Sequence, residues 1–220
     1  MFRLIPVLSL EQIAKLRAIA STASFVDGRI TNPHSIVKNN TQLHDPQVYQ
    51  KSADILRNGL LASAEFREIA FPKAIAPPML TQYQPGMAYG LHTDAALMHL
   101  PLGTIRADLS CTVFLSDPDE YAGGALRIML GNSQIAFKEI AGMAIVYPST
   151  TLHQVDPVTQ GVRLVGITFI QSRIADPHRR DIMFELNEVA ALEGLNMAHE
   201  NYTRLQSVRE NLMRRWADAS

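Results

Sequence analysis

The chain has 220 residues, of which 47% are hydrophobic and 19% charged, and its formal net charge of −1 gives no reason to expect binding to nucleic acid or to an anionic membrane. This length predicts one domain, or one domain with a small appendage, and leaves room for a buried core. Cys111 is the single cysteine and has no disulfide partner within the chain, the N-terminus does not resemble a signal peptide, and no apolar run reaches membrane-spanning length, so we expect a cytoplasmic protein.

The first forty residues predict a helix followed by a short strand. Ser9 is a suitable N-cap and Gln12 completes a capping box, and the apolar stripe that follows predicts a helix that ends between residues 21 and 24. Residues 25–30 resemble a strand broken by the Asp27–Gly28 turn. The polar segment 31–43 predicts a loop or an edge strand near the surface.

A second helix is expected to begin at Asp45–Pro46, where a cap precedes a proline in the first turn. Its predicted buried face comprises Val48, Ile55, Leu56 and Leu60, and a shorter helix is expected at 63–70. After three prolines the pattern changes to short segments rich in β-branched residues and separated by turns. We expect strands at 79–84, 109–115, 125–129, 134–137, 143–147 and 162–171, which is typical of a sandwich or jelly roll. Two further helices are predicted near 178–193 and 197–217.

Two histidines and one aspartate form a candidate metal site in this β region. His92 and Asp94 are two residues apart, so on an extended segment their side chains lie on the same face. His153 follows Tyr147–Pro148 at a predicted strand end, where a turn can bring the imidazole to the same point. Two imidazoles and one carboxylate with open coordination positions are the facial triad of non-heme Fe(II) oxygenases. The structural alternative is a hydrogen-bonded turn histidine beside a loop-capping aspartate.

Arg163 begins the last predicted strand and shares a face with apolar residues at alternating positions. A buried arginine is costly unless it meets an anion. The anion is either an internal Asp or Glu, or the carboxylate of a ligand held through a bidentate contact.

The chain resembles the prolyl-4-hydroxylase-like Fe(II)/2-oxoglutarate-dependent dioxygenases, and among them the bacterial PKHD-type hydroxylases. The resemblance covers nearly the whole chain and its central motif is Tyr83-x-x-Gly86-x-x-Tyr89-x-x-His92-x-Asp94. Further matching blocks are Phe25-Val26-Asp27-Gly28-Arg29, Lys38-Asn39-Asn40-x-Gln42, Asp108-Leu109-Ser110, Leu115-Ser116-Asp117-Pro118, Tyr121-x-Gly123-Gly124-x-Leu126, Tyr147-Pro148-Ser149 through Leu152-His153, Pro157-Val158-Thr159-x-Gly161-x-Arg163 and Ile170-Gln171-Ser172. Thr93 stands at a spacer position that varies.

This resemblance implies that His92, Asp94 and His153 bind Fe(II) and that Arg163 pairs with the distal carboxylate of 2-oxoglutarate. Tyr83 resembles the family tyrosine that reaches the co-substrate, although a core aromatic with a satisfied hydroxyl is an equal alternative. Gly123–Gly124 either lets a strand pass close to the site or forms a simple hairpin turn. Dioxygen is the second co-substrate, ascorbate (vitamin C) is an optional reductant, and the products are succinate, carbon dioxide and a hydroxylated substrate.

The resemblance also implies an α+β fold with a double-stranded β-helix (jelly roll) core. We expect an N-terminal helical and strand region at 1–78, the dioxygenase core at 79–175 and a helical extension at 176–220. The substrate is an amino-acid side chain, a peptide or a small molecule. Segments 27–42 and 95–107 are candidates for the rim of the pocket, where Arg29, Lys38 and Arg106 either meet an acidic group or are solvated.

Three other functions compete with this interpretation. One is a non-catalytic metal- or 2-oxoglutarate-binding sensor or scaffold, and another is Mn or Zn chemistry in a cupin-like barrel. The third is an interaction protein whose C-terminal helices form a homodimer through the stripe Leu205, Val208, Leu212 and Trp216, although such a stripe more often packs on its own domain.

Overall fold

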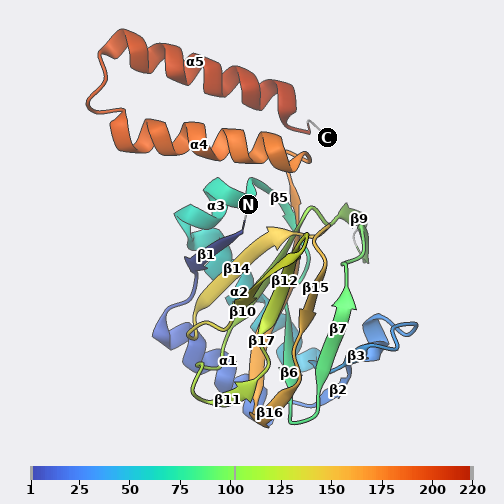
Figure 1. Cartoon of the computed structure of the whole chain (residues 1–220). Coiled ribbons are helices and arrows are strands. Elements are labelled where there is room, and N and C mark those ends of the chain that lie inside the picture. Colours follow the sequence, from blue (N-terminus) through green and yellow to red (C-terminus); the bar gives the residue numbers. More distant parts are fainter. Residues whose placement is uncertain (1, 102, 219–220) are drawn as a thin grey trace.

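The computed structural model describes residues 2–101 and 103–218, and two antiparallel sheets form its centre (Figure 1). The larger sheet contains β1 (Arg3–Pro6), β2 (Phe25–Asp27), β4 (Thr41–Leu43), β5 (Pro72–Ile75), β6 (Met79–Tyr83), β10 (Leu109–Phe114), β14 (Met143–Pro148) and β17 (Arg163–Ser172). Its strand order is β1-β14-β10-β17-β6-β4-β2, and β5 pairs with β17. The smaller sheet contains β3 (Lys38–Asn39), β7 (Ala88–His92), β12 (Leu126–Leu130), β13 (Ser133–Phe137) and β15 (His153–Val155), in the order β13-β12-β15-β7-β3.

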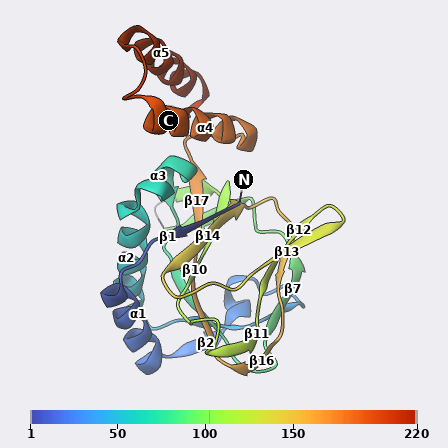
Figure 2. The same cartoon turned by 60° about the vertical axis from the view of Figure 1, so that its left-hand side comes forward.

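Two short strand pairs form separate two-stranded sheets. One is the hairpin of β8 (Leu97–Leu100) and β9 (Gly103–Arg106), and the other joins β11 (Tyr121–Gly123) to β16 (Val158–Gly161). The two facing sheets, with helices outside them, confirm the predicted α+β class and the jelly-roll core (Figure 2).

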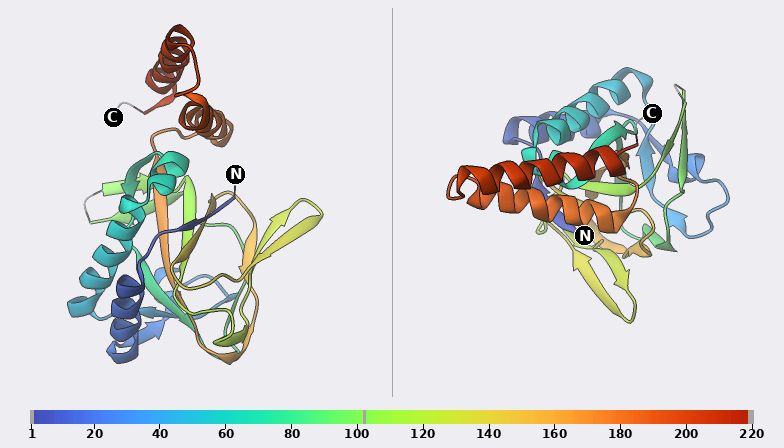
Figure 3. Two further views of the ribbon diagram at one scale, coloured as in Figure 1. Left: turned by 90° about the vertical axis from the view of Figure 1, so that its left-hand side faces the viewer. Right: turned by 90° about the horizontal axis from the view of Figure 1, so that it is seen from above.

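The helices lie on one side and one end of this barrel. They are α1 (Leu10–Thr22), α2 (Pro46–Ala62), α3 (Ala64–Ala70), α4 (Pro177–Glu193) and α5 (His199–Trp216), and a 3-10 turn η1 spans Gly28–Thr31. Helices α1 to α3 cover the outer face of the larger sheet, whereas α4 and α5 form an antiparallel hairpin that projects beyond the end of the barrel (Figure 3). No helix in the described ranges has the length and apolar character needed to cross a membrane.

The helix starts follow the predicted capping chemistry. The Ser9 hydroxyl accepts from the Gln12 backbone N–H, and the Gln12 side chain in turn accepts from the Ser9 N–H, which is the expected capping box. At α2 the Asp45 carboxylate accepts from the Gln47 N–H and Pro46 occupies the first turn. Leu56 and Leu60 are fully buried on this helix. These two predictions are confirmed.

The larger sheet separates two apolar cores, which explains why its central strands are buried on both faces. Alternate residues of β10, namely Leu109, Cys111 and Val113, pack towards the helices with Leu56 and Leu60. Phe114 instead packs inside the barrel, where it meets Tyr83, Tyr147 and Val165. Side chains that alternate with the helix-facing set therefore point into the barrel interior, and Ser110 and Arg163 belong to that inner face.

The predicted loop or edge strand at 31–43 is present in the first part of this segment, since residues 32–37 form no strand and are mostly exposed and β3 is an edge strand of the smaller sheet. The prediction is wrong for the last part, which forms β4. Strand β4 lies inside the larger sheet between β6 and β2, and Asn40 and Gln42 are 3% and 4% exposed. Each amide makes one hydrogen bond, since Asn40 donates to the Tyr83 hydroxyl and Gln42 accepts from Thr31, whereas Asn40 Oδ1 has no partner among the described residues. The predicted break of the strand at Asp27–Gly28 is confirmed, since β2 ends at Asp27, but a 3-10 turn that begins at Gly28 replaces the strand expected to continue to residue 30.

The six predicted strands are each present within about one residue of their expected ends. Predicted helices at 178–193 and 197–217 correspond to α4 and α5. Within α5, Leu212 and Trp216 pack against a small core of Phe71, Ile174 and Met183, so half of the predicted stripe packs on its own chain.

Candidate metal centre

Three side chains converge at the mouth of the barrel: His92, Asp94 and His153. His92 ends β7 and His153 begins β15, and the two residues are direct cross-strand partners. One possible ligand atom from each of the three residues lies within 4.8 Å of the other two. The Asp94 carboxylate is 4.0 Å from His92 Nε2 and 3.6 Å from His153 Nε2. The sequence placed all three residues on this site, and the fold brings them together.

Both imidazoles are held in the orientation that a metal requires. His92 Nδ1 lies 2.7 Å from the Gly90 carbonyl oxygen, and His153 Nδ1 lies 2.9 Å from that of Thr151. Because a carbonyl oxygen can only accept, each Nδ1 carries a proton, and in the neutral imidazole this leaves the lone pair on Nε2. Those are the two nitrogen atoms that face Asp94. This arrangement of a ligand and its outer hydrogen-bond partner is typical of metal-binding histidines.

The Asp94 carboxylate is fixed from β10 and from the turn after β14. Ser110 Oγ donates to Asp94 Oδ2 at 2.6 Å, and it also lies 2.8 Å from Ser149 Oγ. Both serines are buried, with exposures of 2% and 3%. Because Ser110 occupies Oδ2, the other carboxylate oxygen of Asp94, Oδ1, stays available for a cation.

Two tyrosine rings enclose the histidines. Tyr89 stacks on His92 with ring centroids 3.6 Å apart, and Tyr147 meets His153 edge-on at 5.1 Å. Burial, followed by the neighbouring His153, lowers the pKa of His92 to about 4, so this imidazole is neutral near pH 7. Neutral imidazole is the protonation state that binds a metal ion.

Arg163 lies deeper in the barrel, opposite Tyr83 on the neighbouring strand β6. The residue is 1% exposed, and its guanidinium carbon lies 5.0 Å from the Tyr83 ring centroid and 5.9 Å from that of Phe114. Among the described residues it forms no ion pair, and its Nε and Nη1 have no hydrogen-bond partner. The internal Asp or Glu that the structural alternative required is therefore absent from that part of the chain. An uncompensated buried guanidinium fits an anionic ligand.

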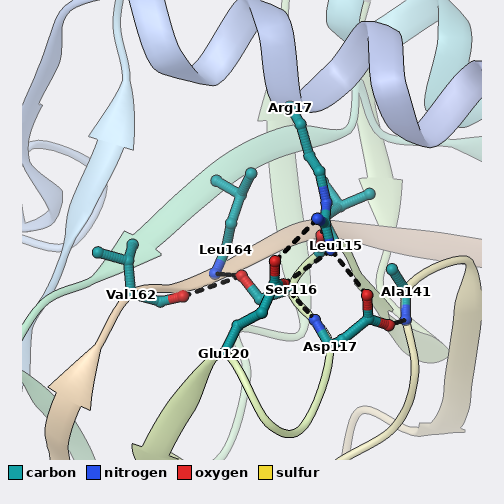
Figure 4. Close-up of polar contacts among 8 residues, drawn as sticks. All are labelled: Arg17, Leu115, Ser116, Asp117, Glu120, Ala141, Val162 and Leu164. Atoms are coloured by element: carbon teal, nitrogen blue, oxygen red, sulfur yellow. Dashed lines mark hydrogen bonds and ion pairs between the residues drawn. The ribbon is translucent and has the colours of Figure 1, made fainter.

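The strand that carries Arg163 is anchored by Ser116 (Figure 4). Ser116 Oγ donates to the Val162 carbonyl and accepts from the Leu164 N–H, each at 2.9 Å, so it holds both neighbours of Arg163. The turn that contains Ser116 is tied in turn to α1, because Arg17 Nε donates to the Leu115 carbonyl at 2.6 Å. These contacts fix the direction in which Arg163 leaves the backbone.

The Tyr83 hydroxyl is satisfied on one side only. Asn40 Nδ2 donates to it at 2.9 Å, which leaves the phenolic proton of Tyr83 free to be donated to another group. Burial raises the pKa of this phenol, so the proton is retained at neutral pH. Tyr83 is therefore a core aromatic whose hydroxyl accepts one hydrogen bond and has a proton left to donate, and the Arg163 guanidinium lies over its ring.

The three positively charged residues of the predicted pocket rim, Arg29, Lys38 and Arg106, have different partners. Arg29 pairs with Asp27, and Arg106 pairs with Asp108 at 2.6 Å and with Asp218 at 2.9 Å. Lys38 is 8% exposed and donates to Thr31 Oγ1 at 2.7 Å, and it has no ion pair with any described residue. Of the three, Lys38 is the residue that stays a candidate for an acidic group.

Sequence reasoning assigned no role to Ser110, Ser149, Ser116 or Asn40, although each lies within a quoted motif. The signal that could have found Ser110 is its position on β10, where it alternates with the core-facing Leu109 and Cys111. The other three act through loops or turns, and no periodicity predicts their direction.

Comparison with known proteins gives one consistent result. Residues 78–171 match the model of the 2OG-Fe(II) oxygenase superfamily. A PKHD-type hydroxylase of Sphingopyxis alaskensis is 57% identical over 98% of this chain and 99% of its own length. A second one, of Synechococcus elongatus, is 39% identical over 96% of this chain and 97% of its own. A solved prolyl hydroxylase of Trichoplax adhaerens, in complex with a peptide fragment, covers 78% of this chain and 83% of its own with a TM-score of 0.59 at 12% identity, which shows a shared fold.

Proposed function

The chain belongs to the PKHD-type hydroxylases of the 2OG-Fe(II) oxygenase superfamily, and we propose that His92, Asp94 and His153 bind its Fe(II) while Arg163 binds 2-oxoglutarate. Its activity is that of an Fe(II)/2-oxoglutarate-dependent dioxygenase, and the similarity to hydroxylases over nearly the whole chain favours catalysis over a non-catalytic sensor or scaffold. One observation carries the residue assignment: two imidazole nitrogens and a carboxylate within 4.8 Å of one another lie in the same barrel as a buried guanidinium that has no counter-ion among the described residues.

When Fe(II), 2-oxoglutarate and dioxygen are bound, they supply oxidative decarboxylation to succinate and carbon dioxide, coupled to hydroxylation of a C–H bond. The protein contributes orientation and exclusion of water. Nδ1–H bonds to two backbone carbonyls hold both Nε2 lone pairs in place, and Ser110 holds the Asp94 carboxylate. Arg163 would fix the far end of the diacid through a forked contact.

We also propose that the Tyr83 hydroxyl donates to 2-oxoglutarate. Its proton is free because Asn40 occupies the oxygen as a donor, and the guanidinium of Arg163 lies over its ring. Loss of this donor would weaken co-substrate binding without changing metal binding, because none of the three candidate ligands contacts the Tyr83 hydroxyl through a hydrogen bond that the structure describes.

Reconstitution metal by metal tests the proposal. Protein purified without metal and oxygen should release succinate from 2-oxoglutarate only after Fe(II) is added, and Mn(II) or Zn(II) should give less than about a tenth of that rate, since neither supports this redox chemistry. Succinate is measured by chromatography, with 2-oxoglutarate and metal but no protein as the blank. Equal turnover with Zn(II) would favour the cupin-like alternative. Ascorbate should raise the total number of turnovers if it keeps the iron reduced.

The substrate is proposed to be a small molecule or an amino-acid side chain in a peptide. The solved prolyl hydroxylase from Trichoplax adhaerens that holds a peptide supports the peptide option, and the rim at 27–42 and 95–107 supplies the surfaces that would select the substrate.

We further propose that the protein is cytoplasmic. Cys111 is buried, and burial raises its thiol pKa to about 12, so it is inert and compatible with a reducing compartment. Cell fractionation with an antibody measures this directly. The division into an N-terminal region (1–78), a dioxygenase core (79–175) and a helical extension (176–220) stays a prediction.

A homodimer through α4 and α5 is also proposed. Leu212 and Trp216 are used within the chain, but Val189, Leu192 and Val208 on the hairpin are 43%, 71% and 50% exposed. At micromolar concentration the wild type should sediment as a dimer, and the double variant Leu192→Lys/Val208→Lys as a monomer with unchanged 2-oxoglutarate turnover. A wild type that sediments as a monomer at these concentrations would refute the dimer.

A further inference from the structure

A second buried tyrosine, Tyr121, faces Arg163 and has no assigned role. It begins β11 and pairs with Gly161 of β16, and it is 4% exposed. Its hydroxyl forms no hydrogen bond of normal geometry with a described residue, although the Arg163 guanidinium lies close enough to act on it and to oppose the effect of burial on its pKa. A buried phenol that makes no hydrogen bond has lost its hydrogen bonds to water without replacing them, which is unfavourable. Such an atom needs an explanation, and a bound ligand is one.

The phenol ring lies against the guanidinium because Gly124 leaves room for both. A Cβ at Gly124 would lie 3.0 Å from Tyr121 Cε2 and 3.1 Å from Arg163 Cδ, and its φ of +65° is also unfavourable for other residues. Cε2 is next to the carbon that carries the hydroxyl, and Cδ is next to Nε. The unpartnered hydroxyl and the unpartnered Nε therefore belong to groups that pack side by side.

Contacts from outside the barrel keep the ring in this orientation. Lys138 Nζ donates to the Tyr121 carbonyl at 2.6 Å and lies 4.2 Å from the ring centroid. Burial raises the pKa of the Tyr121 phenol, and the opposing effect of Arg163 does not reverse this, so the hydroxyl keeps its proton at neutral pH. The group is a neutral donor next to a cation.

We propose that Tyr121 is a second binding residue for the distal carboxylate of 2-oxoglutarate, to which its hydroxyl donates one hydrogen bond beside the forked contact from Arg163. The proposal rests on the proposed role of Arg163. A carboxylate has about four lone-pair sites, and a guanidinium fork fills two of them. Phenol donors on β6 and β11, from Tyr83 and Tyr121, are available for the remaining sites. Three donor side chains, Arg163, Tyr83 and Tyr121, at the same end of the pocket would select a diacid over a 2-oxo monoacid.

Calorimetric titration of the anaerobic Fe(II)-loaded protein tests this. Tyr121→Phe removes only the hydroxyl and should raise the dissociation constant for 2-oxoglutarate about tenfold to a hundredfold, the usual effect of losing a hydrogen bond to a charged group. Binding of 2-oxopentanoate, which has the same chain length without the distal carboxylate, should not change. Tyr49→Phe is the matched control, because Tyr49 lies on α2 and its hydroxyl donates to the Pro77 carbonyl, outside the barrel.

Three outcomes would overturn the proposal, and they can be told apart. An unchanged dissociation constant for 2-oxoglutarate in Tyr121→Phe removes the contact. Equal weakening of 2-oxoglutarate and 2-oxopentanoate would make the ring a packing residue without a role in diacid selection. If the wild type itself does not prefer the diacid, the assignment of Arg163 fails first and that of Tyr121 fails with it. Thermal unfolding of each variant shows whether any loss reflects a damaged fold.

Discussion

Replacing Arg163 by methionine should raise the dissociation constant for 2-oxoglutarate by at least about a hundredfold and leave the ligand-free protein as stable as the wild type or more stable. Truncating one partner of a buried, hydrogen-bonded charge pair costs about 2–5 kcal/mol of binding, which is roughly thirtyfold to several thousandfold. Arg163 is 1% exposed, so its contact with a bound carboxylate would be of this buried kind.

The expected gain in stability has a separate cause. In the ligand-free protein the guanidinium has been removed from water, and its Nε and Nη1 have no partner in the described chain. Replacing a buried ion pair by well-packed apolar side chains is often neutral or stabilising by about 1–4 kcal/mol, and a buried charge without a counter-ion has no Coulombic attraction to lose. Methionine is flexible enough to pack between Tyr83 and Phe114, which flank the guanidinium.

Two measurements separate a ligand-binding role from a structural one. Calorimetry gives 2-oxoglutarate binding, and thermal unfolding without co-substrate gives stability. Arg163→Lys is the intermediate variant, because it keeps the charge and loses the fork, and its binding should weaken by about tenfold. If Arg163→Met unfolds several degrees below the wild type and still binds 2-oxoglutarate normally, Arg163 supports the fold and not the co-substrate.

The sequence predicted the elements whose signals are local. The capping box at Ser9, the Asp45–Pro46 start and the long apolar strand that begins at Arg163 each depend on residues within a few positions of one another. The face of Arg163 was also predictable, because alternation along β17 places it with Val165 inside the barrel. The opposite face of β17 packs on the helices, so the strand is buried on both sides.

Short strands with distant partners were not predictable. Strand β15 has only three residues, and it is a strand because it pairs with β7 and β12, which are remote in the chain. Strand β11 is also short and pairs with a distant strand, β16. For that reason the sequence does not predict the direction of the Tyr121 side chain. In both strands, the position of the side chain depends on cross-strand register, which one sequence does not contain.

Polar residues were misplaced for a related reason. Segment 31–43 resembles a loop by composition, yet Asn40 and Gln42 are buried, and each amide has one remote hydrogen-bond partner, Tyr83 on β6 for Asn40 and Thr31 in the 3-10 turn for Gln42. The same reasoning explains Ser110, whose hydroxyl is buried against Asp94. A buried polar side chain with a remote partner cannot be distinguished from a surface residue by composition alone.

Replacing His153 by alanine should abolish iron retention and lower succinate production by more than about a hundredfold. Two ligands remain in this variant, and one of them, Asp94, loses the imidazole 3.6 Å from its Oδ2. Loss of a residue that only supports a metal ligand typically costs about 10–100-fold, so loss of a ligand itself should exceed that range. Iron content after anaerobic desalting and succinate release are the two measurements. His199→Ala, at the exposed start of α5, controls for the loss of one histidine.

His153 is 4% exposed and packs against Tyr147, so the variant His153→Ala also creates a cavity. Unfolding curves would detect that effect, and a folded variant with full iron content would remove His153 from the metal site.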